Sequence, residues 1–414
     1  MLNIKKAYSS TDGLEKYFPA LYGEVTQWQK KRYSNLFDAF KTSFNCDRAY
    51  FASSSGRVEV CGNHTDHNGG KVISCAISLD TLAAFMPNDK NVINIKSEGY
   101  ADISIDLLGA ENEEKGTSAA IVRGVAVATK NKGYKVGGFD ACFTSNVVGG
   151  AGISSSASFE VLVAEIFNFI YNDGKITAEE KAVISQFAEN EYFGKPCGLL
   201  DQTAIAFGGL NLLDFKDKGK IGVKSINNDL KDYTLVLINT GGSHADLTDE
   251  YAAVPREMFS VANALGKDRL IESSKEEFLE KLSSISGLSD RAVLRAMHFY
   301  NENERVENAY NALNKNDYVN FLTAVKESGI SSMCLLQNCF VAGRADELIP
   351  KALAITENYL DGGVNRVHGG GFAGSILNIV KNESLDKFLT KSREFYPKED
   401  VIPLRVSSCG AIVL

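Results

Sequence analysis

Residues 149–158 read GGAGISSSAS, between a strand-like stretch, DACFTSNV (140–147), and a stretch with helical periodicity, FEVLVAEIFNFI (159–170). Glycines let a backbone approach a ligand closely, and successive backbone N–H groups in such a loop form an anion-binding nest. The serines then begin the helix, where unpaired N–H groups and the helix dipole favour phosphate. A flexible turn with a serine N-cap is the alternative, but three consecutive serines between a strand and a helix favour a phosphate-binding loop.

The same loop excludes two common nucleotide-binding motifs. The sequence contains no GxxxxGK followed by Ser or Thr, which excludes a Walker-type nucleotide hydrolase. Gly150 and Gly152 begin a GxG, but Ser155 stands where the dinucleotide-binding fingerprint has its third glycine. The loop therefore predicts phosphate binding of another class.

Length and composition predict a two-domain α/β protein. The 414 residues exceed the size at which a single core usually stops growing. Helical periodicity in the first fifty residues, which includes Trp28, Tyr33 and Phe40, is followed by strand patterns up to about residue 105, and both patterns then alternate. Thr177 and Glu180 have the spacing of a helix capping box. The segment 247–357 is mostly helical, between the strand TLVLINT (234–240) and two late strands. We place the domain boundary near 225–231, which gives domains of residues 1–230 and 231–414.

Charge and cysteine usage narrow the class of protein. A net charge of −8 argues against nucleic-acid binding, which needs a basic surface. The eight cysteines show no CxxC pair and no zinc-finger spacing, which is typical of buried free thiols in a reducing compartment. The N-terminal residues lack the apolar core of a signal peptide, and no stretch approaches the length of a membrane span. We therefore expect a cytoplasmic protein with neither a nucleic-acid nor a membrane partner.

A second polar segment, GRVEVCGNHTDHNGG (56–70), lies between two predicted strands. It holds one arginine, two histidines, an aspartate and two asparagines, and this density of directional hydrogen-bonding groups suits a polyhydroxylated ligand. An Asx-rich turn is one alternative. A metal site at His64, Asp66 and His67 is another, which the lack of a further ligand cluster disfavours.

Two further segments carry weaker signals. In ENEYFGKPCGLLDQ (189–202), Asp201 stands in an apolar run after a Pro-Cys-Gly turn, where it could act in chemistry or serve as a helix N-cap. HGGGFAGS (368–375) is a glycine-rich turn that leads into the strand ILNIV. Neither segment predicts a function by itself.

Taken in order, the four segments resemble the GHMP kinases, and among them the galactokinase family. GRVEVCGNHTDHNGG is similar to the family's sugar signature, usually read as GRVNLIGEHTDYNGG, and VVGGAGISSSASFEV is similar to its phosphate loop. YFGKPCGLLDQ resembles the segment of the catalytic aspartate, and RVHGGGFAGS resembles the C-terminal glycine motif. The resemblance covers about residues 48–380. It implies an N-terminal α/β domain, a ferredoxin-like C-terminal domain and an active site between them.

The resemblance also implies an ATP- and Mg²⁺-dependent sugar-1-kinase, a small-molecule sugar as substrate and a monomeric chain. Asp201 matches the general base, and Arg57 matches the arginine that orients it and neutralises developing charge. The implied sugar-binding residues are Arg57, Asn63, His64, Asp66, Gly198, Asp201 and Tyr251. The implied phosphate-binding residues are Gly149, Gly150, Ala151, Gly152, Ile153, Ser154, Ser155 and Ser156. The implied Mg²⁺ ligands are Ser156 and Glu189.

One departure from the family motif bears on the substrate. Asn63 replaces the glutamate of GEHTDY, at a position implied to contact the C6 hydroxyl of the sugar. Galactose is the expected substrate, because losing the charge at this position costs only about 1 kcal/mol of hydrogen-bond energy. A sugar with a C6 carboxylate, such as galacturonate, is the alternative. A glutamate about 4 Å away would repel that carboxylate by about 4 kcal/mol, whereas Asn63 could donate to it.

A non-catalytic sensor of galactose and ATP is an alternative from a different class. Such a protein could lose residues needed for phosphoryl transfer while keeping those needed for binding. Asp201, Arg57, Glu189 and the whole serine run are all present, so the sequence favours an enzyme.

Overall fold

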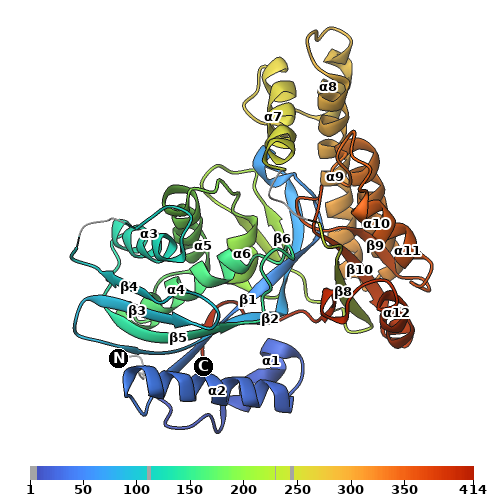
Figure 1. Ribbon diagram of the computed structural model, residues 1–414. Helices are drawn as coiled ribbons and strands as arrows, with labels where there is room; N and C mark the ends of the chain where they lie inside the picture. The colour runs from blue at the N-terminus through green and yellow to red at the C-terminus, as the bar shows by residue number, and fades with distance from the viewer. Residues whose placement is uncertain (1–6, 110–112, 229, 243–246) are drawn as a thin grey trace.

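The computed structural model describes residues 7–109, 113–228, 230–242 and 247–414, and their strands form two sheets (Figure 1). The first sheet has eight strands, in the order β12-β1-β2-β5-β3-β4, with β6 paired to β2 and β7 paired to β6. All its pairs are antiparallel except β3 with β5. Its strands are β1 (Tyr50–Cys61), β2 (Lys71–Pro87), β3 (Val92–Ser97), β4 (Ile103–Asp106), β5 (Phe139–Ser145), β6 (Leu210–Asp214), β7 (Gly222–Ser225) and β12 (Ile412–Val413).

Helices cover both faces of the first sheet, because successive residues of its central strands point to opposite sides. In β2, Leu82 and Ala84 pack with the N-terminal helices, whereas Ala83 and Phe85 pack against α3 and α4. Figure 1 shows the two groups of helices on opposite sides of the sheet. The N-terminal group is α1 (Phe18–Tyr22) and α2 (Gln27–Phe44), and the other is α3 (Ser118–Asn131), α4 (Ser155–Tyr171), α5 (Ala178–Phe187) and α6 (Leu200–Phe207).

Two details test the helix predictions. Thr177 caps α5 in a reciprocal capping box with Glu180, as their spacing predicts. The helix predicted at Trp28, Tyr33 and Phe40 is confirmed as α2; Tyr33 and Phe40 are buried in it, whereas Trp28 is 57% exposed. The Trp28 ring lies over Arg32, whose guanidinium is buried and paired with Asp80, so an ion pair occupies part of the face that periodicity assigns to apolar packing.

The second sheet has four antiparallel strands in the order β11-β8-β10-β9. Numbered along the chain, this is the order 4-1-3-2, with helices in the first and last connections, which is a ferredoxin-like arrangement. The predicted fold class is therefore confirmed. The strands are β8 (Tyr233–Asn239), β9 (Val364–Val367), β10 (Ser375–Lys381) and β11 (Val401–Leu404). The helices are α7 (Thr248–Ala264), α8 (Lys275–Leu282), α9 (Asp290–Asn314), α10 (Tyr318–Ser331), α11 (Leu348–Glu357) and α12 (Leu385–Ser392).

The chain passes from the first sheet to the second between β7 and β8, and β12 then returns to pair with β1. The boundary near 225–231 stays a prediction, and the C-terminal strand lies outside such a linear division. One hydrophobic cluster joins the two sheets, with Val58 and Ile73 from the first, Leu237 and Leu377 from the second, and Ile153 from the glycine-serine loop. This shared core holds that loop at the junction. Within the described ranges, no helix combines the length and apolar character required to cross a bilayer.

Candidate active site

A cavity of about 440 Å³ lies between the loop after β1, the start of α6 and the C-terminal glycine motif. The structure brings together around it every residue that the resemblance implies for sugar binding: Arg57, Asn63, His64, Asp66, Gly198, Asp201 and Tyr251. Glu59, His67 and Cys197 line it as well. These residues come from distant parts of the sequence, so the cavity exists only in the folded chain.

Asp201 connects the cavity to the glycine-serine loop. Arg57 donates from Nε and Nη2 to Asp201 Oδ1, at 2.8 and 2.7 Å. Ser154 Oγ donates to the other carboxylate oxygen at 2.5 Å. The N-cap of α6 is Leu199, so Asp201 lies within the first turn and does not serve as the cap. About one third of its side chain remains exposed.

The glycine-serine loop presents the start of α4 as an anion site. Ser154 is the N-cap residue, but no side chain in the described part of the protein caps the helix there, because Ser154 Oγ is bound to Asp201. Ser154 has a φ of 63°, a left-handed conformation that costs about 1–3 kcal/mol in a non-glycine residue and often occurs at functional sites. The first-turn N–H groups of this 17-residue helix are thus left for a phosphate.

Not every loop residue can contact a ligand with its side chain. Ala151 and Ile153 are buried in the core that joins the sheets. Hydrogen bonds from the core fix three successive backbone carbonyls of the loop. Ser375 Oγ donates to the carbonyl of Ala151 at 2.9 Å, Arg57 Nη1 donates to that of Gly152, and the Arg57 backbone N–H donates to that of Ile153 at 3.2 Å. Ala151 and Ile153 therefore shape the loop, and only their backbone could bind phosphate.

Glu189 forms a second polar centre beside the loop. Ser156 Oγ donates to Glu189 Oε1 at 3.0 Å, and Lys195 Nζ lies 3.2 Å from the same oxygen. Gln202 Nε2 donates to Oε2 at 2.8 Å. Burial and the charge of Glu189 raise the pKa of neighbouring Glu160 well above its usual value. The region around Glu189 therefore disfavours additional negative charge unless a cation is present.

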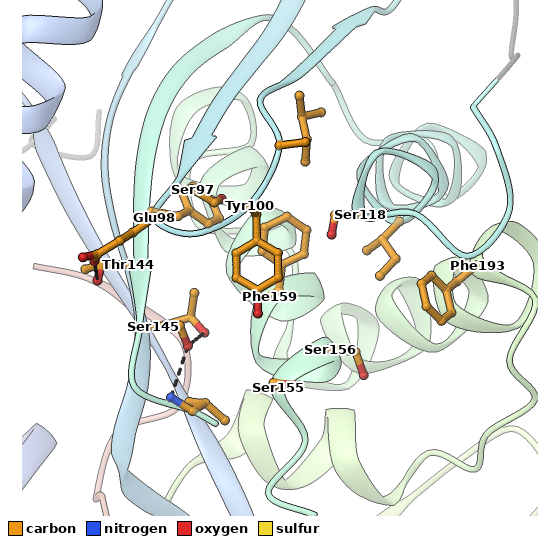
Figure 2. A pocket seen from close by; sticks show the side chains of 16 residues that line it. Ser97, Glu98, Tyr100, Ser118, Thr144, Ser145, Ser155, Ser156, Phe159 and Phe193 are labelled. Carbon is orange, nitrogen blue, oxygen red and sulfur yellow. Dashed lines mark hydrogen bonds between the residues drawn. The ribbon is translucent and has the colours of Figure 1, made fainter. Parts of the chain in front are cut away.

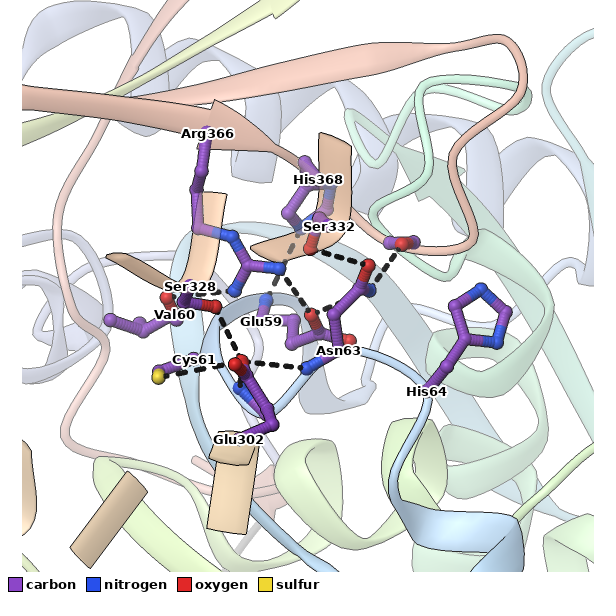
Figure 3. A network of polar contacts seen from close by, with 12 residues as sticks. Glu59, Val60, Cys61, Asn63, His64, Glu302, Ser328, Ser332, Arg366 and His368 are labelled. Atoms are coloured by element: carbon purple, nitrogen blue, oxygen red, sulfur yellow. Dashed lines mark hydrogen bonds and ion pairs between the residues drawn. The ribbon is translucent and has the colours of Figure 1, made fainter. Parts of the chain in front are cut away.

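The loop after β1 is anchored from α9 (Figure 3). Glu302, which is fully buried, accepts from the backbone N–H groups of Gly62 and Asn63 at 2.9 and 3.3 Å, and Arg305 and Ser328 also donate to it. Burial by itself would raise the pKa of Glu302, but nearby His298, Arg305 and Arg366 lower it to about 2. Glu302 therefore stays ionised and fixes the loop.

The Asn63 side chain has no remaining hydrogen-bonding capacity. Its Nδ2 donates to Glu59 Oε1 at 2.9 Å and to the carbonyl of Gly369 at 2.7 Å. Its Oδ1 accepts from Asn338 at 2.7 Å and from Ser332 at 3.3 Å. Asn63 lines the cavity as predicted, but the expectation that its amide is available to donate to a substrate carboxylate is wrong, because both N–H groups already have partners.

Comparisons with known proteins agree with this geometry. Residues 38–87 match the galactokinase galactose-binding signature, and residues 119–209 match the N-terminal domain of GHMP kinases. The galactokinase of Clostridium tetani is 33% identical over 350 residues, which are 83% of this chain and 87% of that protein. The galactokinase of Clostridium beijerinckii is 33% identical over 358 residues, 83% of this chain and 88% of that protein. The chain belongs to the galactokinase family.

Solved structures show the same fold. Lactococcus lactis galactokinase complexed with galactose has a TM-score of 0.81 and 24% identity, covering 92% of this chain and 100% of that one. L. major mevalonate kinase in complex with R-mevalonate has a TM-score of 0.59 and 16% identity, covering 86% of this chain and 96% of that one. As a member of the galactokinase family, the chain is a phosphotransferase with an alcohol group as acceptor, and galactokinases use ATP as the donor.

Contacts across the cavity explain three of the family-implied residues. A Cβ on Gly198 would lie 2.3 Å from Asp66 Oδ2, so any other residue at this position would displace that carboxylate. His64 Nε2–H donates to the carbonyl of Gly370 at 2.9 Å, and Tyr251 OH donates to Gly371 at 2.6 Å. Burial and His67 lower the pKa of His64 to about 4, so the ring is neutral. His64 and Tyr251 thus hold the C-terminal glycine motif of this galactokinase-family chain against the loop after β1, residues 62–70, which we call the sugar loop.

A second cavity, of about 210 Å³, has Ser155 and Ser156 of the glycine-serine loop in its lining (Figure 2). Tyr100, Phe159 and Phe193 line it, so it is an apolar space next to the phosphate loop. Sequence reasoning missed these residues, because they come from a turn after β3, from α4 and from the helical segment after α5.

Replacing His298 with glutamine is expected to reduce the pH dependence of stability. Burial lowers the pKa of His298, with Glu302 opposing that effect, and its Nε2–H donates to the carbonyl of Asn63 at 2.9 Å. The unfolded chain takes up a proton at this histidine below about pH 6.5 whereas the folded chain does not, so stability falls as the pH falls. The loss between pH 7.5 and 5.5 should be larger in the parent by up to about 1.4 kcal/mol.

Urea unfolding of parent and variant at both pH values measures this difference. Comparing the two proteins cancels the titration of all other groups that the substitution leaves unchanged. Equal losses of stability in the two proteins would show that His298 is protonated as easily in the folded chain as in the unfolded one.

Proposed function

We propose that this chain is a galactokinase that transfers the γ-phosphoryl group of ATP to the anomeric hydroxyl of galactose. The observation that carries the proposal is the position of Asp201, which lines the sugar cavity and at the same time bonds to Ser154 of the phosphate loop. A hydroxyl beside Asp201 would face a phosphate bound at the start of α4. The galactokinase names of the relatives support galactose as the acceptor.

The proposed mechanism assigns one role to each group around Asp201. The Asp201 carboxylate accepts the proton of the sugar hydroxyl as the hydroxyl oxygen attacks the γ-phosphorus of ATP. The bond between that phosphorus and the oxygen bridging to the β-phosphate breaks, and ADP leaves. Arg57 fixes the carboxylate through two N–H groups and places positive charge beside the reacting oxygen. Phosphoryl transfer depends mainly on positioning and charge stabilisation, which Arg57 and the N–H groups of the loop would supply.

The glycine-serine loop and the apolar cavity beside it suit the two parts of the proposed nucleotide site. The N–H groups at Ser155 and Ser156 would hold the phosphates, and the apolar cavity that begins at these serines would hold the adenine ring between aromatic side chains. In this proposed arrangement the γ-phosphate would lie at the end of the loop that faces Asp201.

Ser156 and Glu189 fit a bound Mg²⁺ ion. Mg²⁺ prefers oxygen ligands and is commonly held by one or two side chains together with water and substrate phosphates. Ser156 Oγ and Glu189 Oε1 lie 3.0 Å apart at the phosphate loop. The Lys195 ammonium forms an ion pair with the Glu189 carboxylate. The Lys195 side chain is 64% exposed, so it can move away when another cation binds. A bound Mg²⁺ would neutralise phosphate charge.

The cavity disfavours galacturonate, which the sequence left open. Glu59 lines the same cavity as Asn63, so a carboxylate is present beside the sugar in spite of the substitution at position 63. At about 4 Å, two carboxylates repel by about 4 kcal/mol at an effective dielectric constant of 20.

The alternative of a non-catalytic sensor is also disfavoured. The residues required for phosphoryl transfer, Arg57, Asp201 and Glu189, are all present and in contact with their expected partners, which favours an enzyme.

An ADP-release assay with a panel of sugars tests the proposal. With Mg²⁺ and ATP, galactose should give the highest kcat/KM, above galacturonate, N-acetylgalactosamine, arabinose and glucose. EDTA should abolish turnover, and added Mg²⁺ should restore it. A higher kcat/KM for another sugar would overturn the substrate assignment, and sugar binding without ADP release would favour the sensor.

A further inference from the structure

Glu59 is a buried carboxylate that the roles above leave unexplained. Glu59 lies on β1, is only 3% exposed and lines the sugar cavity. Asn63 Nδ2 and Arg366 Nη2 donate to its Oε1 at 2.9 and 3.2 Å, as Figure 3 shows. No described residue donates a hydrogen bond to Oε2. One oxygen of this carboxylate is therefore fixed, and the other keeps its full capacity to accept.

The side-chain amide of Asn63, which contacts Glu59, has no hydrogen-bonding capacity left for a substrate. Both N–H groups and the carbonyl of Asn63 have partners, and His298 and Glu302 hold the backbone of the same residue. Between the two side chains, only Glu59 can accept a further hydrogen bond in the cavity. Burial raises the pKa of Glu59, while Arg366 and Arg57 oppose the rise, so a donor from a substrate would replace solvation that the carboxylate lacks.

The sequence around the pair shows an exchange of residues. The usual signature GRVNLIGEHTDYNGG has asparagine where this chain has Glu59, and glutamate where this chain has Asn63. The two side chains touch directly, so the exchange keeps one carboxylate and one amide in the pair. It also keeps a charge opposite Arg366, whose guanidinium is buried and would be costly to leave unpaired.

We propose that Glu59 is the specificity-determining carboxylate of this chain, which accepts a hydrogen bond from a hydroxyl of the sugar, and that Asn63 is a positioning residue that holds it. The inference rests on the proposed function and deepens it. It explains how the chain selects a neutral sugar over a uronate with an asparagine at position 63. It also predicts that the two positions depend on each other.

Four variants test the exchange: E59Q, E59N, N63E and the double variant E59N/N63E. With galactose, E59Q should raise KM about tenfold or more, because it removes a charged hydrogen-bond acceptor, and should change kcat less. It should also lower the preference for galactose over galacturonate about tenfold. E59N and N63E should each lower kcat/KM more than tenfold, and the double variant should restore it to within about threefold of the parent.

E165Q is the matched control, since Glu165 is a partly buried carboxylate that pairs with Lys181 outside both cavities. It should leave KM and the sugar preference unchanged. Thermal unfolding and ATP binding show whether each variant is folded. If E59Q or a single exchange fails to fold, a functional double variant still supports the inference, because the pair is then restored.

Two results would overturn the inference. One is a folded E59Q protein with the KM and sugar preference of the parent. The other is a double variant no better than the worse of its two single variants. All variants are assayed with the sugar that the parent prefers, so a parent that does not phosphorylate galactose counts against the proposed function alone. A lack of coupling between positions 59 and 63 counts against the exchange alone.

Discussion

Replacing Asp201 with asparagine is expected to lower kcat with galactose at least a hundredfold and to leave the Kd for ATP within about threefold of the parent. Asparagine keeps the size of the side chain, and its oxygen can still accept from Ser154 or Arg57. It cannot accept a proton from the sugar hydroxyl, and positioned bases contribute about 10²- to 10⁴-fold to turnover. The loop N–H groups that would hold the phosphates do not involve this side chain. Turnover is measured by ADP release, and ATP affinity by calorimetry.

Asp140→Asn is the matched control for this substitution. Asp140 is a partly buried aspartate on β5 that accepts from Asn88 and Asn94 and lines neither cavity. Its replacement should leave kcat and ATP affinity unchanged. Loss of ATP binding in D201N, in a protein that remains folded, would mean that Asp201 supports the nucleotide site and that its assigned role is incorrect.

Replacing Glu302 with alanine is expected to lower the free energy of unfolding by about 3–5 kcal/mol. The substitution removes the acceptor for two backbone N–H groups of the sugar loop and leaves Arg305, whose side chain is only 12% exposed, without its carboxylate. Because the loop loses its anchor, KM for galactose should also rise. Urea unfolding and sugar kinetics measure the two effects.

Glu304→Ala on the same helix provides the control. Glu304 lies two residues away, its side chain is 60% exposed, and it pairs only loosely with Lys275, at 3.3 Å. An exposed ion pair of this kind contributes about 0–1 kcal/mol. An E302A protein as stable as E304A, with the galactose KM of the parent, would show that the loop does not depend on the contact with α9.

Much of the candidate site could be predicted because its chemistry lies in short segments with unusual composition. Arg57, Asp201 and the serine run each occur in a motif that can be recognised in the sequence alone, and the structure brings them together. Glu59 and Glu302 could not be found in this way. Glu59 reads as one more residue of a strand, and Glu302 reads as a charged position on a helix. Their importance arises from contacts between residues more than 200 positions apart.

The fold was predictable where the patterns are long. The helices and the strands β1, β2, β5, β8 and β10 have enough residues for a period to emerge, whereas β6, β7, β9 and β11 have only four or five. β11 also contains Pro403, which argues against a strand in the sequence but is tolerated here because β11 lies at the edge of its sheet. The return of β12 to the first sheet depends on tertiary pairing that no local pattern encodes.

The most direct test of the account is the structure of the product. The purified protein is incubated with Mg²⁺, ATP and galactose, and the reaction is followed by phosphorus NMR with coupling to the sugar protons. The account predicts one new phosphate monoester, coupled to the anomeric proton, that accumulates in step with ADP and forms at least a hundredfold more slowly in the D201N reaction. A phosphate on another carbon, or ADP formed at the same rate without sugar, would contradict it.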